Sequence, residues 1–156
     1  MFSPLDEALM RTALEEANAA YQAGEIPVGA VVARGDEIVS RARNEREASG
    51  DPTAHAEILA IRRAAEALGG RRLNGLTLYV TLEPCPMCAG AVAMSGISRL
   101  VYGAKDAQYG CAGSVYRLTE DPAFPSFCPA DGGLCEEECA RLLKRFFEAR
   151  RIVEKR

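Results

Sequence analysis

The sequence predicts an α/β fold in which helices pack on a central sheet. Apolar residues recur at helical spacing near the N-terminus, and short runs rich in Val and Ile follow them. The predicted order along the 156 residues is helix, two strands, helix, strand, helix, strand and helix. This alternation is typical of a sheet that is covered by helices.

The first three elements are predicted by caps, periodicity and a turn. Ser3 is a typical N-cap, and the apolar residues that follow it indicate a helix over residues 4–23 with Gly24 as its stop. The runs IPVGAVVAR and EIVSRAR flank Gly35-Asp36, which is a strong two-residue hairpin signal. We therefore expect two antiparallel strands after the first helix.

The remaining elements follow from turn residues and alternation. The polar stretch that ends in Asp51-Pro52 reads as a turn, and Thr53 is the expected cap of a helix over residues 54–68. Later elements are predicted as a strand at 76–82, a helix at 85–94, a strand at 99–104 and a helix at 136–151.

The segment 107–134 has little periodicity. It predicts a long functional loop, or a loop that contains a short helix near residues 115–118. A fifth strand around Phe127 is a further alternative.

Length and composition predict one domain over residues 1–156. Hydrophobic residues make up 48% of the chain and charged residues 26%, which excludes disordered and fibrous proteins. The N-terminus lacks the features of an export signal, and no window is apolar enough to cross a membrane. We therefore expect a cytoplasmic protein without a membrane partner, whose six cysteines are thiols or metal ligands.

The net charge of −3 gives no global attraction to nucleic acid. Basic residues nevertheless crowd the C-terminus, and they read either as a solvated helix face or as a contact with phosphates. They are Arg141, Lys144, Arg145, Arg150, Arg151, Lys155 and Arg156.

The motif Cys85-x-x-Cys88 lies between a predicted strand and a predicted helix. The positive end of the helix dipole favours thiolates there, as zinc ligation requires. A redox dithiol, a structural zinc site and two buried cysteines are alternatives for this motif alone.

The only histidine of the chain, His55, adds a third ligand type and precedes Glu57 by two positions. One imidazole and two thiolates leave the fourth tetrahedral position of zinc open, which is the catalytic arrangement. Glu57 is close enough in sequence to reach that position and to transfer protons there.

His55-Ala56-Glu57 followed by Pro84-Cys85-x-x-Cys88 resembles the signature of the zinc-dependent cytidine and deoxycytidylate deaminase superfamily. Longer segments are similar to bacterial tRNA-specific adenosine deaminases over nearly the whole chain. They are EIPVGAVV, DPTAHAEILAIRRAA, LTLYVTLEPCPMCAGA, RLVYGAKDA, GCAGS and CARLLKRFFEARR. The resemblance implies a three-layer α/β/α cytidine-deaminase-like fold, with a central mixed sheet of about five strands flanked by helices.

The resemblance also implies a reaction, namely hydrolytic deamination of adenosine to inosine at the wobble position of a tRNA anticodon. It implies one catalytic Zn²⁺ per chain, held by His55, Cys85 and Cys88, which activates water as the attacking hydroxide. Glu57 is the implied proton shuttle. A homodimer is implied as well, with the helix after Cys85 contributing to the contact.

Further positions match family segments that contact the substrate. Asn44 is expected to hydrogen-bond the purine, and the backbone N–H of Ala56 is expected to steady the attacking water. The pocket wall is expected from Pro27, Val28 and Gly29, the RNA-facing loop from Lys105 and Asp106, and RNA contacts in the last helix from Arg150 and Arg151.

Two features depart from this pattern or extend it. Pro125-Ser126 stands where the family usually has Asn-His, so the alternative is a deaminase of a free base or nucleoside such as guanine, cytosine or cytidine. The other cysteines are interpreted as structural, and a second zinc site is the alternative for them. They are Cys111, Cys128, Cys135 and Cys139.

Overall fold

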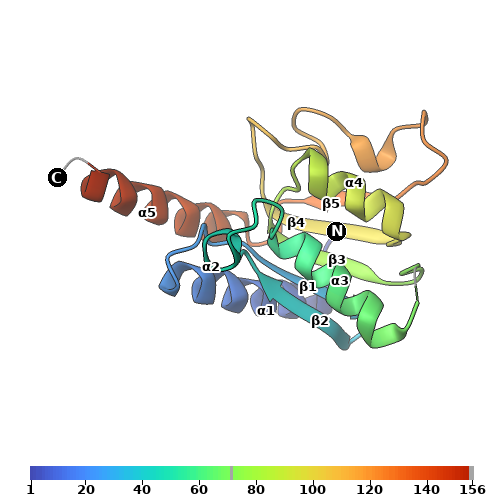
Figure 1. The fold of residues 1–156 in the computed structure, drawn as a ribbon. Helices are drawn as coiled ribbons and strands as arrows, with labels where there is room; N and C mark the ends of the chain where they lie inside the picture. Colours follow the sequence, from blue (N-terminus) through green and yellow to red (C-terminus); the bar gives the residue numbers. More distant parts are fainter. Residues whose placement is uncertain (71, 155–156) are drawn as a thin grey trace.

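A five-stranded mixed sheet organises the protein, whose computed structural model describes residues 1–70 and 72–154 (Figure 1). The strand order is β2-β1-β3-β4-β5. β1 is antiparallel to β2 and to β3, whereas β3, β4 and β5 are parallel. The strands are β1 (Gly29–Arg34), β2 (Glu37–Arg43), β3 (Thr77–Leu82), β4 (Arg99–Ala104) and β5 (Ala130–Gly132).

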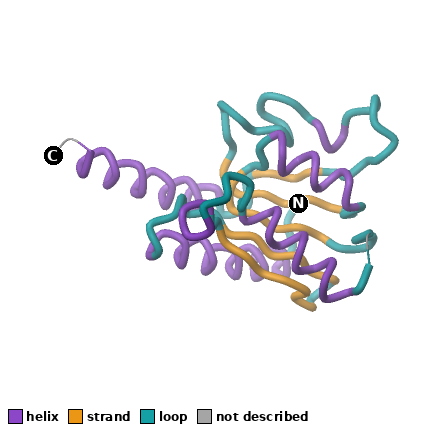
Figure 2. Tube along the Cα trace, viewed as in Figure 1, coloured by secondary structure: helices purple, strands orange, loops and turns teal. Residues whose placement is uncertain are grey.

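Helices cover both faces of this sheet (Figure 2). One face packs against α1 (Pro4–Gln22) and α5 (Glu136–Glu154), and the other face packs against α3 (Ala56–Leu68) and α4 (Pro86–Ser95). The C-terminal part of α5 extends beyond the sheet (Figure 1). The predicted three-layer α/β/α fold is therefore confirmed.

Strand residues alternate between two apolar layers. Ala30 and Val32 of β1 belong to the cluster under α3 and α4, while Val31 and Ala33 belong to the cluster under α1. This alternation follows from the period of two along a strand. Because both faces are covered, the central strands are apolar on both sides.

A buried carboxylate ties α1 to the sheet. Asp6 and the N-cap Ser3 form a capping box, as expected for the predicted cap. Asp6 also accepts two hydrogen bonds from Arg99, at 2.8 and 3.1 Å, and one from the Tyr79 hydroxyl at 2.7 Å. Arg99 therefore holds the pKa of Asp6 well below its usual value of 3.8.

The polar stretch before α3 folds differently from the sequence-based expectation. Part of the stretch that was expected to form a turn is the short helix α2 (Arg46–Ser49). The expected cap at Thr53 is wrong, because Thr53 donates to Asp51 Oδ1 through both its N–H and its hydroxyl, and His55 is the N-cap of α3. Asp51 thus closes an Asx turn that delays the helix by two residues.

The long segment after β4 is largely irregular, as expected. Its short helix is the 3-10 turn η1 (Leu118–Glu120), which begins three residues after the expected position. The fifth strand exists, but β5 begins three residues after Phe127. Among the described residues, no helix is long and apolar enough to span a membrane.

Replacing Asp6 with Asn will destabilise the protein, because Arg99 and Tyr79 would lose a buried charged acceptor that is only 4% exposed. We expect a loss of about 2–3 kcal/mol at pH 7 in urea unfolding, since Arg99 is itself partly exposed. The native pKa of Asp6 is lowered, so this stability is present above pH 3.8 and disappears as the pH falls through the native pKa. Glu7→Gln, an exposed neighbour, is the control; equal losses would contradict the assignment.

Candidate metal centre and active site

The sheet topology brings four loop segments to one edge. β3 and β4 are parallel, so the residues after Leu82 and after Ala104 leave the sheet on the same side. β1 is antiparallel to β3, and Gly29 pairs with Arg43, so the start of β1 and the end of β2 lie at this edge too. Segments that are far apart in the sequence therefore meet where the chain leaves the strands.

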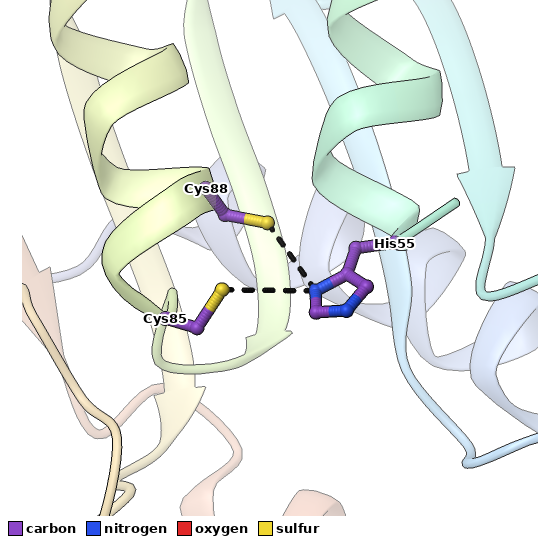
Figure 3. A group of neighbouring side chains, drawn as sticks. All are labelled: His55, Cys85 and Cys88. Carbon is purple, nitrogen blue, oxygen red and sulfur yellow. Dashed lines mark hydrogen bonds between the residues drawn. The ribbon is translucent and has the colours of Figure 1, made fainter. Parts of the chain in front are cut away.

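Three of the predicted site residues converge at this edge (Figure 3). The His55 Nδ1 atom lies 3.7 Å from the Cys85 sulfur and 3.5 Å from the Cys88 sulfur. All three ligand atoms lie within 4.8 Å of one another. His55 comes from the start of α3, and the two cysteines come from the start of α4.

These separations fit a tetrahedral zinc ion. Ligand nitrogen and sulfur atoms at about 2.1 and 2.3 Å from zinc lie about 3.6 Å apart when the geometry is tetrahedral. The two observed distances from His55 Nδ1, 3.7 and 3.5 Å, bracket this value. The residue types also match, because imidazole and thiolate are preferred zinc ligands and three of them leave one position open.

The helix starts explain why the ligands lie so close together. His55 is the N-cap of α3 and Cys85 is the N-cap of α4, both in extended backbone conformation, and neither side chain caps its own helix. The N–H groups of both first turns therefore point toward this edge of the sheet and favour negative charge there. Pro86, at the first helical position of α4, has no N–H to satisfy.

The thiols and the imidazole influence one another. A hydrogen bond from Cys88 lowers the pKa of Cys85 to about 4, and the same bond raises the pKa of Cys88. The hydrogen bond with Cys85 raises the pKa of His55. The cluster therefore favours a thiolate at Cys85, which is the form that ligates a metal.

Glu57 lies in the first turn of α3 and is only 4% exposed. Burial raises the pKa of its carboxyl to about 7, although the neighbouring His55 acts in the opposite direction. A carboxyl with such a pKa can both accept and return a proton near neutral pH.

A cavity of about 900 Å³ opens beside these residues. Its volume lies within the range of small-molecule sites, toward the upper end. The lining includes His55 and Cys85 of the metal group, the neighbouring carboxylate of Glu57 and several of the predicted substrate contacts, whereas the buried Cys88 lies behind it. The predicted residues in the lining are Val28, Asn44, His55, Ala56, Glu57, Cys85, Lys105 and Asp106.

Asn44 is held in place by its own neighbours. Its Nδ2 group donates to the Ile26 carbonyl at 3.3 Å, and its Oδ1 atom accepts from the Arg46 N–H at 3.2 Å. One side-chain N–H and one oxygen lone pair remain for a bound molecule.

Some predicted site residues lie elsewhere. Gly29 faces α1, where an added Cβ atom would lie 2.0 Å from the Ala13 carbonyl oxygen, and Pro27 is buried outside the cavity lining. Pro125-Ser126 is also outside the lining, on the irregular segment before β5.

The predicted RNA contacts on the last helix lie on its exposed C-terminal part. Arg150 stacks over Phe146, with its guanidinium carbon 5.6 Å from the ring centroid, and Arg151 donates to the Phe147 carbonyl. Lys155 and Arg156 of the basic cluster are outside the described residues.

Sequence reasoning missed several residues of the cavity. Arg46, Tyr109 and Phe147 line it, and so do Ile26 and Leu143. Phe147 and Leu143 are four residues apart on α5, so helical periodicity indicates a shared face, but only the tertiary structure places that face at the cavity.

The remaining cysteines do not belong to the group of neighbouring ligand atoms that His55, Cys85 and Cys88 form. Cys111, Cys128 and Cys139 are buried, and Cys135 is half-buried. Cys139 packs against β4, because a Cβ atom on Gly103 would lie 2.5 Å from its sulfur. Close packing explains the placement of this thiol without a metal.

Comparison with known proteins gives consistent matches. Residues 5–120 match the MafB19-like deaminase family. A tRNA-specific adenosine deaminase of Bacillus subtilis is 46% identical over 150 residues, which cover 96% of this chain and 93% of the relative. One from Haemophilus influenzae is 46% identical over 154 residues, covering 98% and 89% of the two chains. The chain belongs to the tRNA-specific adenosine deaminase family.

Solved structures share the fold of this deaminase. A structure from a study of A-to-I editing by tRNA:A34 deaminases superimposes with a TM-score of 0.83 at 43% identity, covering 86% of this chain and 98% of that one. The guanine deaminase of Nitrosomonas europaea gives a TM-score of 0.79 at 25% identity, covering 94% and 85%. The two neighbours thus differ clearly in their sequence identity to this chain, whereas their folds are almost equally similar to it.

Proposed function

We propose that this protein deaminates adenosine to inosine at the wobble position of a tRNA anticodon. Water adds at the ring carbon that bears the exocyclic amine, that amine leaves as ammonia, and the ring keeps the oxygen. The observation that carries the substrate is the 46% identity to a tRNA-specific adenosine deaminase over 96% of this chain, against 25% over 94% of the chain to one guanine deaminase and 39% over only 64% of the chain to another. An anticodon loop suits such an enzyme, because its bases can be turned outward at low cost.

The geometry of the site supports hydrolytic deamination. His55, Cys85 and Cys88 would hold one Zn²⁺ ion, and their distances fit a tetrahedral ion. Zinc supplies a Lewis acid that lowers the pKa of water and leaves a position open for it. The N–H of Ala56, in the first turn of α3, would donate to the oxygen of the attacking water.

Glu57 would carry the protons of the reaction. Its carboxylate takes a proton from the attacking water and delivers it to the ring nitrogen, and a second transfer converts the exocyclic amine into ammonia. Its burial supports this role, because a desolvated carboxyl binds and releases a proton near neutral pH. No net proton is gained or lost by Glu57 over one cycle.

The rest of the cavity would bind the nucleotide. The remaining N–H and lone pair of Asn44 would hydrogen-bond the purine, and Val28 would pack against it. Lys105 and Asp106 would face the RNA beside the outward-turned base, and Arg150 and Arg151 would contact phosphates farther along α5. We also infer that the protein acts in the cytoplasm, where its tRNA substrate would be met.

The protein would work as a homodimer in which α4 contributes to the contact. Its sequence PMCAGAVAMS is apolar on all sides, but only Cys88, Ala89 and Val92 of this helix are buried in the single chain. A helix that is apolar all round is normally covered. Met94, which is 82% exposed, is the largest apolar side chain left open on α4.

Incubation with defined substrates tests the proposal directly. We expect inosine in an anticodon stem-loop that contains a wobble adenosine. We expect no product from guanine, cytosine or cytidine, because these lack the flanking nucleotides that the proposed substrate contacts require. Liquid chromatography of the digested RNA measures the product. Deamination of a free base without any inosine in the RNA would replace the proposed substrate with that base.

Replacement of Glu57 with Gln will remove the proton carrier but keep the metal ligands. We expect kcat to fall about 10²- to 10⁴-fold while about one zinc ion per chain remains. Elemental analysis and inosine formation give the two readouts. Glu66→Gln, an exposed position on the same helix, is the control and should keep full activity. Activity that survives in Glu57→Gln would exclude the proposed role.

Introduction of a charge on α4 tests the dimer. Met94→Glu places a carboxylate in the proposed contact, so we expect a shift from dimer to monomer in sedimentation velocity. Val153→Glu carries the same change at an exposed position of α5 and should leave the dimer intact. An unaffected Met94→Glu dimer would place the interface elsewhere.

A further inference from the structure

Glu83 is a buried carboxylate that the proposed chemistry does not use. It follows β3 directly and is only 2% exposed. Its Oε1 atom accepts from the Asp106 N–H at 3.1 Å and from the Ser114 hydroxyl at 2.5 Å. Its Oε2 atom accepts from the N–H groups of Ala112 and Ser114, at 3.2 and 2.9 Å. All four hydrogen bonds come from one segment, residues 106–114.

This segment forms a wall of the cavity without being part of the sheet. Residues 106–109 of this segment line the cavity together with Lys105, which joins the segment to the end of β4. Asp106 turns the chain there, because its Oδ1 atom accepts from the N–H groups of Gln108 and Tyr109. The carboxylate that sequence analysis assigned to the substrate therefore already shapes the loop.

Glu83 replaces the backbone partners that this segment lacks. A buried N–H without an acceptor is costly, and an irregular segment offers few carbonyl groups in the right place. One carboxylate supplies four acceptor positions at a single point. The path of residues 106–114 is thus held by the side chain that directly follows β3.

The close fit at Gly110 gives a second observation. A Cβ atom at this position would lie 2.4 Å from the Glu83 carboxyl carbon and 2.5 Å from the Asp106 carbonyl oxygen. The segment therefore wraps directly over the carboxylate, and a larger residue would force the two apart. The Gly110 N–H also donates to the Asp106 carbonyl, which closes the turn.

We propose that Glu83 is a positioning residue, which holds residues 106–114 in the conformation that receives the substrate. This rests on the proposed function, in which Lys105 and Asp106 face the RNA. The carboxylate has no free acceptor position for a proton or a ligand, so Glu83 acts through the segment. The reacting groups lie on α3 and α4, and Glu83 therefore governs substrate affinity more than the chemical step.

Glu83→Gln tests the proposal with minimal change in shape. An amide offers one oxygen and presents an NH₂ group to donors, so part of the segment loses its acceptor. We expect KM for the anticodon stem-loop to rise about tenfold, kcat to stay within about threefold, and zinc content to remain unchanged. Hydrogen exchange at the amides of Asp106, Ala112 and Ser114 should accelerate in the protein without RNA.

Glu25→Gln is the matched control. Glu25 is also 2% exposed and accepts from the N–H groups of Glu47 and Ala48 in α2, on another side of the cavity. Its replacement should accelerate exchange at those two amides and leave residues 106–114 protected. Ser114→Ala removes only the hydroxyl donor to Glu83, so it should raise KM by a smaller factor. This variant replaces Glu83→Gln in the test if Glu83→Gln does not fold.

The outcomes separate the two proposals. Unchanged exchange at residues 106–114 in Glu83→Gln, or a fall in kcat with KM unchanged, overturns the positioning role. Loss of zinc from Glu83→Gln also overturns it, since the residue would then support the ligands. If the wild-type protein makes no inosine, the proposed substrate is wrong, and the exchange measurement still decides whether Glu83 holds the segment.

Discussion

β3 pairs with an antiparallel β1 on one side and with a parallel β4 on the other. The position of the candidate site depends on this pairing. This pairing sends the ends of β2, β3 and β4 and the start of β1 to one edge of the sheet. The starts of α3 and α4 are brought there as well, which places His55 beside Cys85 and Cys88. These side chains come from segments thirty residues apart, and strand order and the helix starts bring them together.

Sequence alone predicted most of this arrangement, because the deciding signals are local. Ser3 caps the first helix, Gly35-Asp36 closes the hairpin, and alternation marks the strands. The grouping of His55 with Cys85 and Cys88 was predictable for a different reason, since few roles need one imidazole and two thiolates at helix starts. The predicted helix cap at Thr53 was wrong because another partner competes for this residue. Thr53 donates its hydrogen bonds to Asp51, and α3 therefore begins later, with His55 as its N-cap.

Long-range acceptors account for the rest of what sequence could not predict. The short helix α2 exists where a turn was expected, because Glu25 accepts the N–H groups of Glu47 and Ala48 from twenty or so residues away. Residues 106–114 depend on Glu83 in the same way. In both cases a buried carboxylate outside the strands stabilises a segment that has no regular backbone partner, and the periodicity of the sequence does not reveal such a contact.

The hydrogen-bond inventory of Asn44 bears on the choice of base. Ile26 and Arg46 occupy one N–H and one lone pair of its amide, so one donor and one acceptor remain. The N7 and N6 edge of adenine presents one acceptor and one donor, whereas the corresponding edge of guanine presents two acceptors. If Asn44 hydrogen-bonds the purine at this edge, as proposed, guanine would leave the Asn44 oxygen facing another oxygen at a residue that is almost fully buried, which would cost free energy. With that contact, the amide of Asn44 would favour adenine, which is the base of the proposed substrate.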